Sequence, residues 1–174
     1  ARQLMSERAK DVHAFVALNC YYADFMADYL STARDKIQVI PHGLNLEGHS
    51  LRAVESLPSG PRVGFLARVC HEKGLHVLLE ACELLAKRPE FAELELLAAG
   101  YLGGRDRSYL ADIQRRAERG PLTGRFQYVG ELSRAQKIEF LQSLHVFSTP
   151  TVYRESKGLP ALEAMANGVP VALP

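Results

Sequence analysis

Two glutamates, Glu155 and Glu163, flank the predicted start of a helix, where carboxylates are well placed to do chemistry. Pro160 marks that start, because the first helical turn is where its fixed φ helps and its missing N–H costs nothing. We therefore expect a helix from about Leu159, with Glu155 in the preceding loop and Glu163 about one turn inside, directed toward that loop. Such carboxylates could hold hydroxyl groups of one ligand, while the unpaired N–H groups of the helix start cradle a phosphate. The alternative is that Glu163 faces solvent and that Glu155 only complements the helix dipole.

Two cations, Arg68 and Lys73, share a predicted turn between a strand and a helix. In parallel sheets, ligands bind beyond the carboxyl ends of the strands, where both this turn and the Glu155 loop belong. Cations there could neutralise a diphosphate, because arginine offers a planar fork of donors and lysine a compact charge. The alternative is that both are exposed loop cations without a ligand.

The helix segment, residues 155–171, resembles the E-x7-E signature of retaining glycosyltransferase family 4. The usual form of that signature is E-G-F-G-L-P-x-L-E-A-M-A-x-G-x-P-V. Ser156 and Lys157 depart from it, because they replace the small and aromatic residues that follow the first glutamate. Besides Glu155, the matching positions are Gly158, Leu159, Pro160, Glu163, Ala164, Met165, Gly168 and Pro170. This resemblance is far more specific than a pair of glutamates.

The turn with the two cations carries a second match. In the family, G-R-L-x-x-E-K-G contains the arginine and lysine that hold the donor diphosphate. Here Arg68, Glu72, Lys73 and Gly74 match in order and spacing, while Ala67 replaces the usual first glycine. Alanine makes that turn slightly less permissive, and we treat the departure as minor.

The resemblance implies an enzyme that moves a sugar from a nucleotide-diphosphate sugar to an acceptor hydroxyl, with retention of configuration at the anomeric carbon. By resemblance, the catalytic residues are Glu155, Arg68 and Lys73, and the diphosphate is bound by Arg68, Lys73, Gly158 and Leu159. The resemblance also implies that the donor sugar is bound by Glu155, Lys157 and Gly158. The ribose is implied to be bound by Glu163, and the nucleobase by Gly130 and Leu132. The alternative is a non-catalytic nucleotide-sugar-binding module on the same fold, which the extra cation Lys157 supports best.

Strand-like and helix-like segments alternate behind these residues. The expected strands are 63–67, 94–99, 126–129, 146–148 and 169–173, and the expected helices are 75–87, 108–119, 133–144 and the one from Leu159. Ser133 is expected to cap its helix. This order predicts an α/β fold with a Rossmann-like parallel sheet covered by helices. The resemblance further implies that the sheet is one half of a two-Rossmann GT-B architecture.

The first part of the chain is expected to belong to another domain. A helix over residues 1–11, a strand over 12–18, a helix over 21–30 and a short strand from 37 precede residues 40–45, I-P-H-G-L-N, which resemble the family's I-P-N-G-V-D crossing. The resemblance thus assigns 1–45 to the end of an N-terminal domain and 46–174 to the nucleotide-sugar-binding domain, incomplete at its C-terminus. Residues 47–61 are polar and turn-rich, which indicates a connecting loop. We expect that these 174 residues cannot catalyse transfer alone.

Composition excludes several classes of partner. The chain has 21 basic and 20 acidic side chains, a net charge of +1 that provides no broad field for nucleic acid. Cys20, Cys70 and Cys82 show no metal or disulfide spacing, and the histidines form no metal pattern, so we expect no metal or other cofactor and a cytoplasmic location. No uncharged run approaches the roughly 18 residues that span a bilayer. The expected partners are a nucleotide-sugar donor and a carbohydrate or other hydroxyl acceptor, with peripheral membrane contact through other segments left open.

Overall fold

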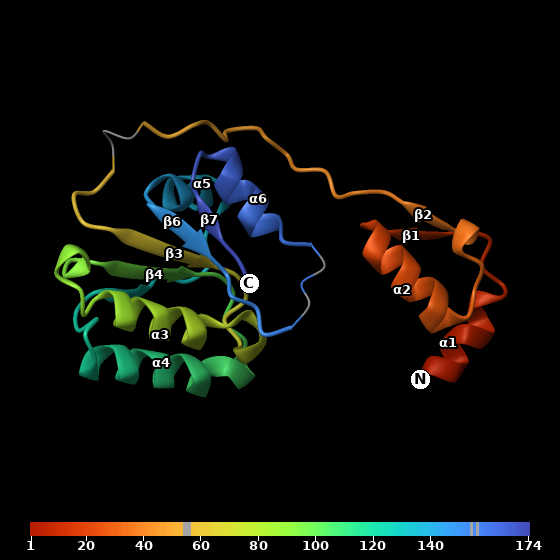
Figure 1. The fold of residues 1–174 in the computed structure, drawn as a ribbon, viewed down its shortest axis with the longest axis horizontal. Coiled ribbons are helices and arrows are strands. Elements are labelled where there is room, and N and C mark those ends of the chain that lie inside the picture. Colours follow the sequence, from red (N-terminus) through yellow and green to blue (C-terminus); the bar gives the residue numbers. More distant parts are fainter. Residues whose placement is uncertain (54–56, 154, 156) are drawn as a thin grey trace. The chain divides into compact units, whose positions relative to one another are not determined.

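The structure is a computed structural model that describes residues 1–53, 57–153, 155 and 157–174 (Figure 1). Ser156, one of the two departures from the family signature, therefore lies outside the described residues. Contacts divide the chain into two compact units, Ala1–Asn45 and Leu46–Pro174. Within the described residues, no helix is both long enough and apolar enough to cross a membrane.

The smaller unit is a short parallel strand pair with two helices. Its main elements are α1 (Arg2–Ala9), β1 (Phe15–Ala17), α2 (Cys20–Leu30) and β2 (Ile37–Val39), and β1 pairs in parallel with β2. The side chain of Asn19 caps α2 by accepting a hydrogen bond from the Tyr22 N–H at 2.8 Å, which satisfies one of the donors left open at a helix start. Small side chains, Ala17, Ala23 and Ala27, form most of its buried core around Ile37.

The larger unit is a five-stranded parallel sheet in the order β5-β4-β3-β6-β7. Its strands are β3 (Arg62–Leu66), β4 (Glu95–Ala99), β5 (Phe126–Tyr128), β6 (Val146–Ser148) and β7 (Val171–Ala172). Its helices are α3 (Leu75–Leu85), α4 (Arg107–Arg119), α5 (Arg134–Gln142) and α6 (Leu159–Ala166). The predicted α/β fold with a helix-covered parallel sheet is confirmed.

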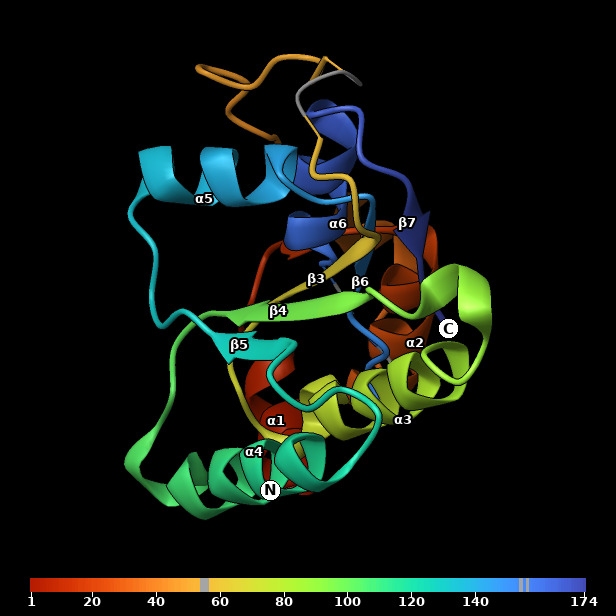
Figure 2. The same ribbon diagram turned by 90° about the vertical axis from the view of Figure 1, so that its left-hand side faces the viewer.

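The helices form two layers, with α3 and α4 on one face of the sheet and α5 and α6 on the other (Figure 2). Successive strand residues point to opposite faces, so Phe65 belongs to the core under α3 and α4, while Leu66 belongs to the core under α5 and α6. Leu79 and Ile113 contribute to the first core, and Phe147 to the second. Burial of these side chains fixes the helices, and hence their loops, against the sheet.

The strand order places a switch point between β3 and β6. The chain runs outward from β3 to β4 and β5, and then crosses back to place β6 on the other side of β3. The loops that leave β3 and β6 therefore diverge to opposite faces of the sheet, which opens a crevice at the carboxyl ends of these two strands. The two predicted motif loops are those that leave β3 and β6.

Candidate functional site

The turn after β3 is held in place by backbone contacts with neighbouring loops. The Val69 N–H donates to the Tyr101 carbonyl at 2.8 Å, and a short 3-10 helix, η3 (His71–Lys73), then leads into α3. Gly74 ends η3 and starts α3 with φ of 76°, and a Cβ there would collide with the Pro150 carbonyl oxygen. Only glycine suits this position, because it needs both the left-handed backbone and the close approach.

The loop after β6 is joined to this turn. The Val152 N–H donates to the Glu72 carbonyl at 3.0 Å, and the glycine contact with Pro150 lies beside it. The two motif loops, far apart in the sequence, therefore form one surface.

Lys73 and Glu155 are brought together on that surface as an ion pair. Their side chains are 18% and 29% exposed, and the Lys73 ammonium lies 5.1 Å from the ring centroid of Tyr153, whose hydroxyl donates to Glu155 Oε2 at 3.3 Å. The Lys157 N–H donates to the other carboxylate oxygen at 3.3 Å. Burial lowers the pKa of Lys73, but its contacts with Glu155 and Tyr153 outweigh burial and raise the pKa above the ordinary lysine value. Lys73 is therefore a cation at neutral pH.

A cavity of about 390 Å³ lies beside this ion pair. Ala67, Lys73, Glu155 and Gly158 line it, so the structure gathers residues from both predicted motifs around one space of the size of small-molecule sites. Gly158 is the N-cap of α6 with φ of 60°, which places the start of that helix at the cavity wall. Thr149 also lines the cavity, and within the described residues its buried Oγ1 has no hydrogen-bond partner. No sequence motif pointed to this threonine.

The other predicted residues are not among the described residues that line this cavity. Arg68 is exposed on the β3 turn, and Lys157 is exposed on the Glu155 loop, while Leu159 is half-buried as the first residue of α6. Gly130 and Leu132 follow β5, where the Gly130 carbonyl accepts from the Gly100 N–H at 2.8 Å. These two lie at the carboxyl end of β5, which β4 and β3 separate from β6 in the sheet.

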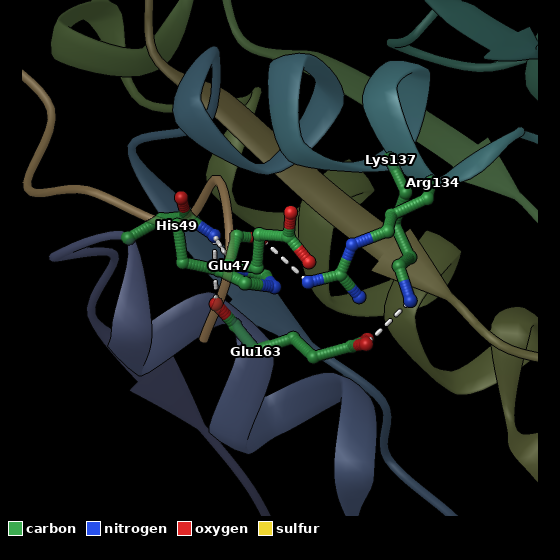
Figure 3. Close-up of polar contacts among 6 residues, drawn as sticks. Glu47, His49, Arg134, Lys137 and Glu163 are labelled. Carbon is green, nitrogen blue, oxygen red and sulfur yellow. Dashed lines mark hydrogen bonds and ion pairs between the residues drawn. The ribbon is translucent and has the colours of Figure 1, made fainter. Parts of the chain in front are cut away.

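Glu163 lies in a different polar cluster, between α5 and α6 (Figure 3). Its side chain is 11% exposed and forms an ion pair with Lys137 of α5, so the alternative of a solvent-facing carboxylate is wrong. Glu163 does not line the cavity beside Glu155; each glutamate is paired with its own lysine. Sequence reasoning missed Lys137. Its position could have indicated an anionic partner, because a cation near the start of a helix interacts unfavourably with the helix dipole.

A fully buried asparagine, Asn167, completes this cluster. Its Nδ2 donates to the Glu163 carbonyl and to His49 Nδ1, both at 2.8 Å, and its Oδ1 accepts from Gln142 Nε2 at 3.2 Å. Its carbonyl accepts from the Arg52 N–H at 3.2 Å. Residues 47–52, part of the predicted connecting loop 47–61, are thus joined to α5 and α6 by hydrogen bonds.

Chemically, the two loops offer a cation, a carboxylate and the start of a helix around one cavity. Such an arrangement suits a ligand that carries both phosphate and hydroxyl groups. In the described part of the chain, no group of three His, Cys, Asp or Glu side chains could hold a metal ion.

A doubly wound parallel domain with a charged cavity at its switch point is typical of the nucleotide-binding α/β proteins. Comparison with known proteins narrows this class. Residues 50–173 match the family described as "Glycosyl transferases group 1", and the chain belongs to that family. The predicted Rossmann-like half of a GT-B glycosyltransferase is confirmed at the level of the fold.

Two curated relatives illustrate the match. The chain is 33% identical over 137 residues to a phosphatidyl-myo-inositol mannosyltransferase of Mycobacterium leprae, which covers 76% of this chain and 33% of that protein. It is 30% identical over 160 residues to a 2-deoxystreptamine glucosyltransferase of Streptomyces kanamyceticus, which covers 86% of this chain and 39% of that protein. The chain thus spans between a third and two fifths of the length of these relatives.

Solved structures share the fold. The chain superposes on Anabaena Alr3699/HepE, solved in complex with UDP and glucose, with a TM-score of 0.78 at 18% identity, over 93% of this chain and 44% of that one. A glycosyltransferase from Rickettsia africae gives a TM-score of 0.79 at 20% identity, over 92% and 44% of the two chains.

Proposed function

We propose that the protein carrying this chain is a retaining glycosyltransferase of family 4, which moves a sugar from a nucleotide-diphosphate sugar to an acceptor hydroxyl. This chain supplies the donor-binding half. The observation that carries the proposal is the Lys73–Glu155 pair on a cavity at the switch point, within a chain of the glycosyl transferases group 1 family. The structure of Anabaena Alr3699/HepE with UDP and glucose supports the choice of a nucleotide sugar.

Arg68 and Lys73 are assigned to the donor diphosphate. As the bond to the sugar breaks, negative charge grows on the departing diphosphate, and fixed cations stabilise that charge without reorganisation. The N–H groups of Gly158 and Leu159 at the start of α6 add to this stabilisation through the helix dipole. Lys73 is already fixed in place by its ion pair, whereas exposed Arg68 is able to fold over the ligand.

The donor sugar is assigned to Glu155, Lys157 and Gly158. The Glu155 carboxylate reaches the cavity wall from the same loop as Lys157, so it can accept hydrogen bonds from sugar hydroxyls beside the diphosphate. Glu155 is therefore assigned a catalytic role through the placement of the sugar, because reaction requires the anomeric carbon to be held in line with its acceptor.

The nucleoside is assigned to the residues outside the cavity. Glu163 holds the ribose, and Gly130 and Leu132, which follow β5, meet the nucleobase. This assignment rests on the family signature together with the low exposure of the Glu163 carboxylate, which forms an ion pair with Lys137.

Residues 1–45 are assigned to the end of an acceptor-binding domain, and residues 46–174 to the donor-binding domain. Enzymes with donor and acceptor on separate domains react only when the two halves close and exclude water. These 174 residues alone are therefore proposed to bind donor weakly and to transfer no sugar.

The test is a screen of the full-length protein against UDP-, GDP- and ADP-sugars. Thermal stabilisation reports binding, release of nucleoside diphosphate reports donor cleavage, and NMR of the product reports the anomeric configuration. We expect one donor to stabilise the protein and to be turned over with retention, equally with and without EDTA. Inversion would refute the retaining mechanism, loss of activity with EDTA would refute the metal-free assignment, and binding without turnover of any donor would favour the non-catalytic module.

A further inference from the structure

The Glu163 carboxylate lies in a site that it could not occupy as an isolated charge. Its side chain is 11% exposed, and an ionised carboxylate removed from water needs a cation or several donors to offset its desolvation. The Lys137 ammonium, on a side chain that is 25% exposed, supplies that cation by binding Oε1 (Figure 3). The pair lies near the protein surface but largely out of water.

The two helices that carry this pair are fixed relative to one another. Lys137 lies in the first turns of α5, whose start is held by a capping box between Ser133 and Gln136, and its N–H donates to the Ser133 carbonyl at 2.8 Å. On α6, the Glu163 carbonyl accepts from Asn167 Nδ2 at 2.8 Å.

Asn167 also joins the two helices directly. Its Oδ1 accepts from Gln142 Nε2, at the end of α5, at 3.2 Å. The lysine and the glutamate therefore project from rigid elements that are bonded together, which is the arrangement that holds a functional side chain in one geometry.

From these contacts we infer that Lys137 is a positioning residue for ribose recognition: it holds the Glu163 carboxylate, ionised and in one orientation, for the ribose hydroxyls of the bound nucleotide. The inference rests on the proposed function, which assigns the ribose to Glu163. A carboxylate bound by lysine through Oε1 keeps lone pairs for hydroxyl donors, so Lys137 and the ribose can share it. Lys137 itself touches neither the sugar to be transferred nor the reacting bond.

This role predicts a specific defect. If Lys137 acts through Glu163, its loss lowers affinity for ribonucleotides and leaves affinity for 2′-deoxyribonucleotides nearly unchanged. A direct contact of Lys137 with the base or the phosphates would instead lower both affinities by the same factor.

The experiment is calorimetry on the full-length protein with UDP and 2′-deoxy-UDP. If the wild type binds GDP or ADP better, that nucleotide and its 2′-deoxy form are used. We expect the wild type to prefer the ribonucleotide by about tenfold, the scale of a hydrogen bond to a charged group. We expect K137M to reduce this preference to less than about threefold, K137R to restore most of it, and E163Q with K137M to add little to either single change. The matched control is K87M, which removes the exposed lysine that follows α3 and should change neither affinity.

Several results would overturn the inference. An unchanged ribose preference in K137M, an equal loss for both nucleotides, or a wild type that does not distinguish them would each do so. If K137M fails to fold by circular dichroism, K137Q, which keeps a hydrogen-bond donor but not the charge, is judged by the same ratio. A wild type that binds none of the three nucleoside diphosphates would refute the proposed function itself, whereas a wild type that selects ribose with K137M unchanged refutes only the role of Lys137.

Discussion

Glu155→Gln is expected to separate nucleotide binding from sugar transfer. In the structure, the Lys73 ammonium is paired with Glu155, and in the proposed complex it also binds the donor diphosphate. The carboxylate and the diphosphate therefore compete for one cation. Glutamine keeps the size of the side chain and removes its charge, so the variant should bind nucleoside diphosphate more tightly and yet turn over the donor sugar more slowly.

The exposure of the pair sets the size of this effect. Fully exposed ion pairs contribute about 0–1 kcal/mol, and hydrogen bonds to charged groups about 1.5–3 kcal/mol. With side chains 18% and 29% exposed, the Lys73–Glu155 pair falls between these limits, and solvent screening favours the lower part of the range. A competition of about 1 kcal/mol corresponds to about fivefold tighter binding of UDP. Turnover of the donor sugar should fall by at least about tenfold, because the lost contact acts in the transition state.

Calorimetry with UDP and steady-state kinetics with the donor sugar measure the two effects on the full-length protein. Two matched variants accompany the test. Glu163→Gln should weaken UDP binding, because the ribose is present in substrate and product alike, and Glu118→Gln on the exposed face of α4 should change neither quantity. If E155Q and E163Q lose UDP affinity to the same extent, the competition and the proposed division of labour are both wrong.

Three further predictions concern the same loops and the buried thiol. Arg68→Ala and Lys73→Ala should each weaken nucleoside diphosphate binding by roughly 1–3 kcal/mol, and unchanged affinity in both by calorimetry would contradict their assignment. Gly74→Ala should lower the free energy of unfolding by about 1–3 kcal/mol or more in denaturant titrations, because alanine is strained at φ of 76° and its Cβ collides with the neighbouring loop. A variant as stable as the wild type would show that the turn is wrongly described. Burial raises the pKa of the Cys82 thiol to about 12, so the native protein treated with iodoacetamide at pH 8.5 should be modified at exposed Cys20 and not at Cys82. The raised pKa also makes the folding stability depend on pH. Above about pH 9 the Cys82 thiol loses its proton in the unfolded state but keeps it in the folded state, so the contribution of Cys82 to stability falls as pH rises.

The sequence predicted the elements better than their lengths. The helix starting at Leu159 was predictable because Pro160 tolerates only the first turn, and the structure begins α6 at that residue. The apolar run 169–173 predicted a longer strand than β7, which spans only Val171–Ala172. Pro170 offers its carbonyl to the Phe147 N–H but has no N–H of its own to continue the ladder. Strand lengths depend on the partner strand, which periodicity does not reveal.

The motif residues were predictable because each motif lies within a short stretch of sequence, where residue types and spacing can be read directly. The pairing of the charged side chains, in contrast, depends on how distant segments pack. Lys73 meets Glu155 because the loops after β3 and β6 lie side by side, and Glu163 meets Lys137 because α5 and α6 pack on one face of the sheet. The sequence directed both glutamates toward one ligand-binding loop. The packing of the helices instead separates them into two ion pairs.

The hydrogen bonds of Asn167 have a practical consequence for anyone who wishes to excise or exchange this domain. By composition, residues 47–52 look like part of a dispensable linker, yet His49 and Arg52 bind the amide and the carbonyl of this fully buried asparagine. A domain cut after Arg52 would leave these groups without those partners, at about 1–3 kcal/mol for each buried group. Typical domains are stable by only roughly 5–15 kcal/mol, so a loss of this size would remove a large part of the stability of the product. A domain boundary drawn after Asn45 keeps the segment that contains His49 and Arg52. Chimaeras between related transferases should therefore transfer this segment together with α6.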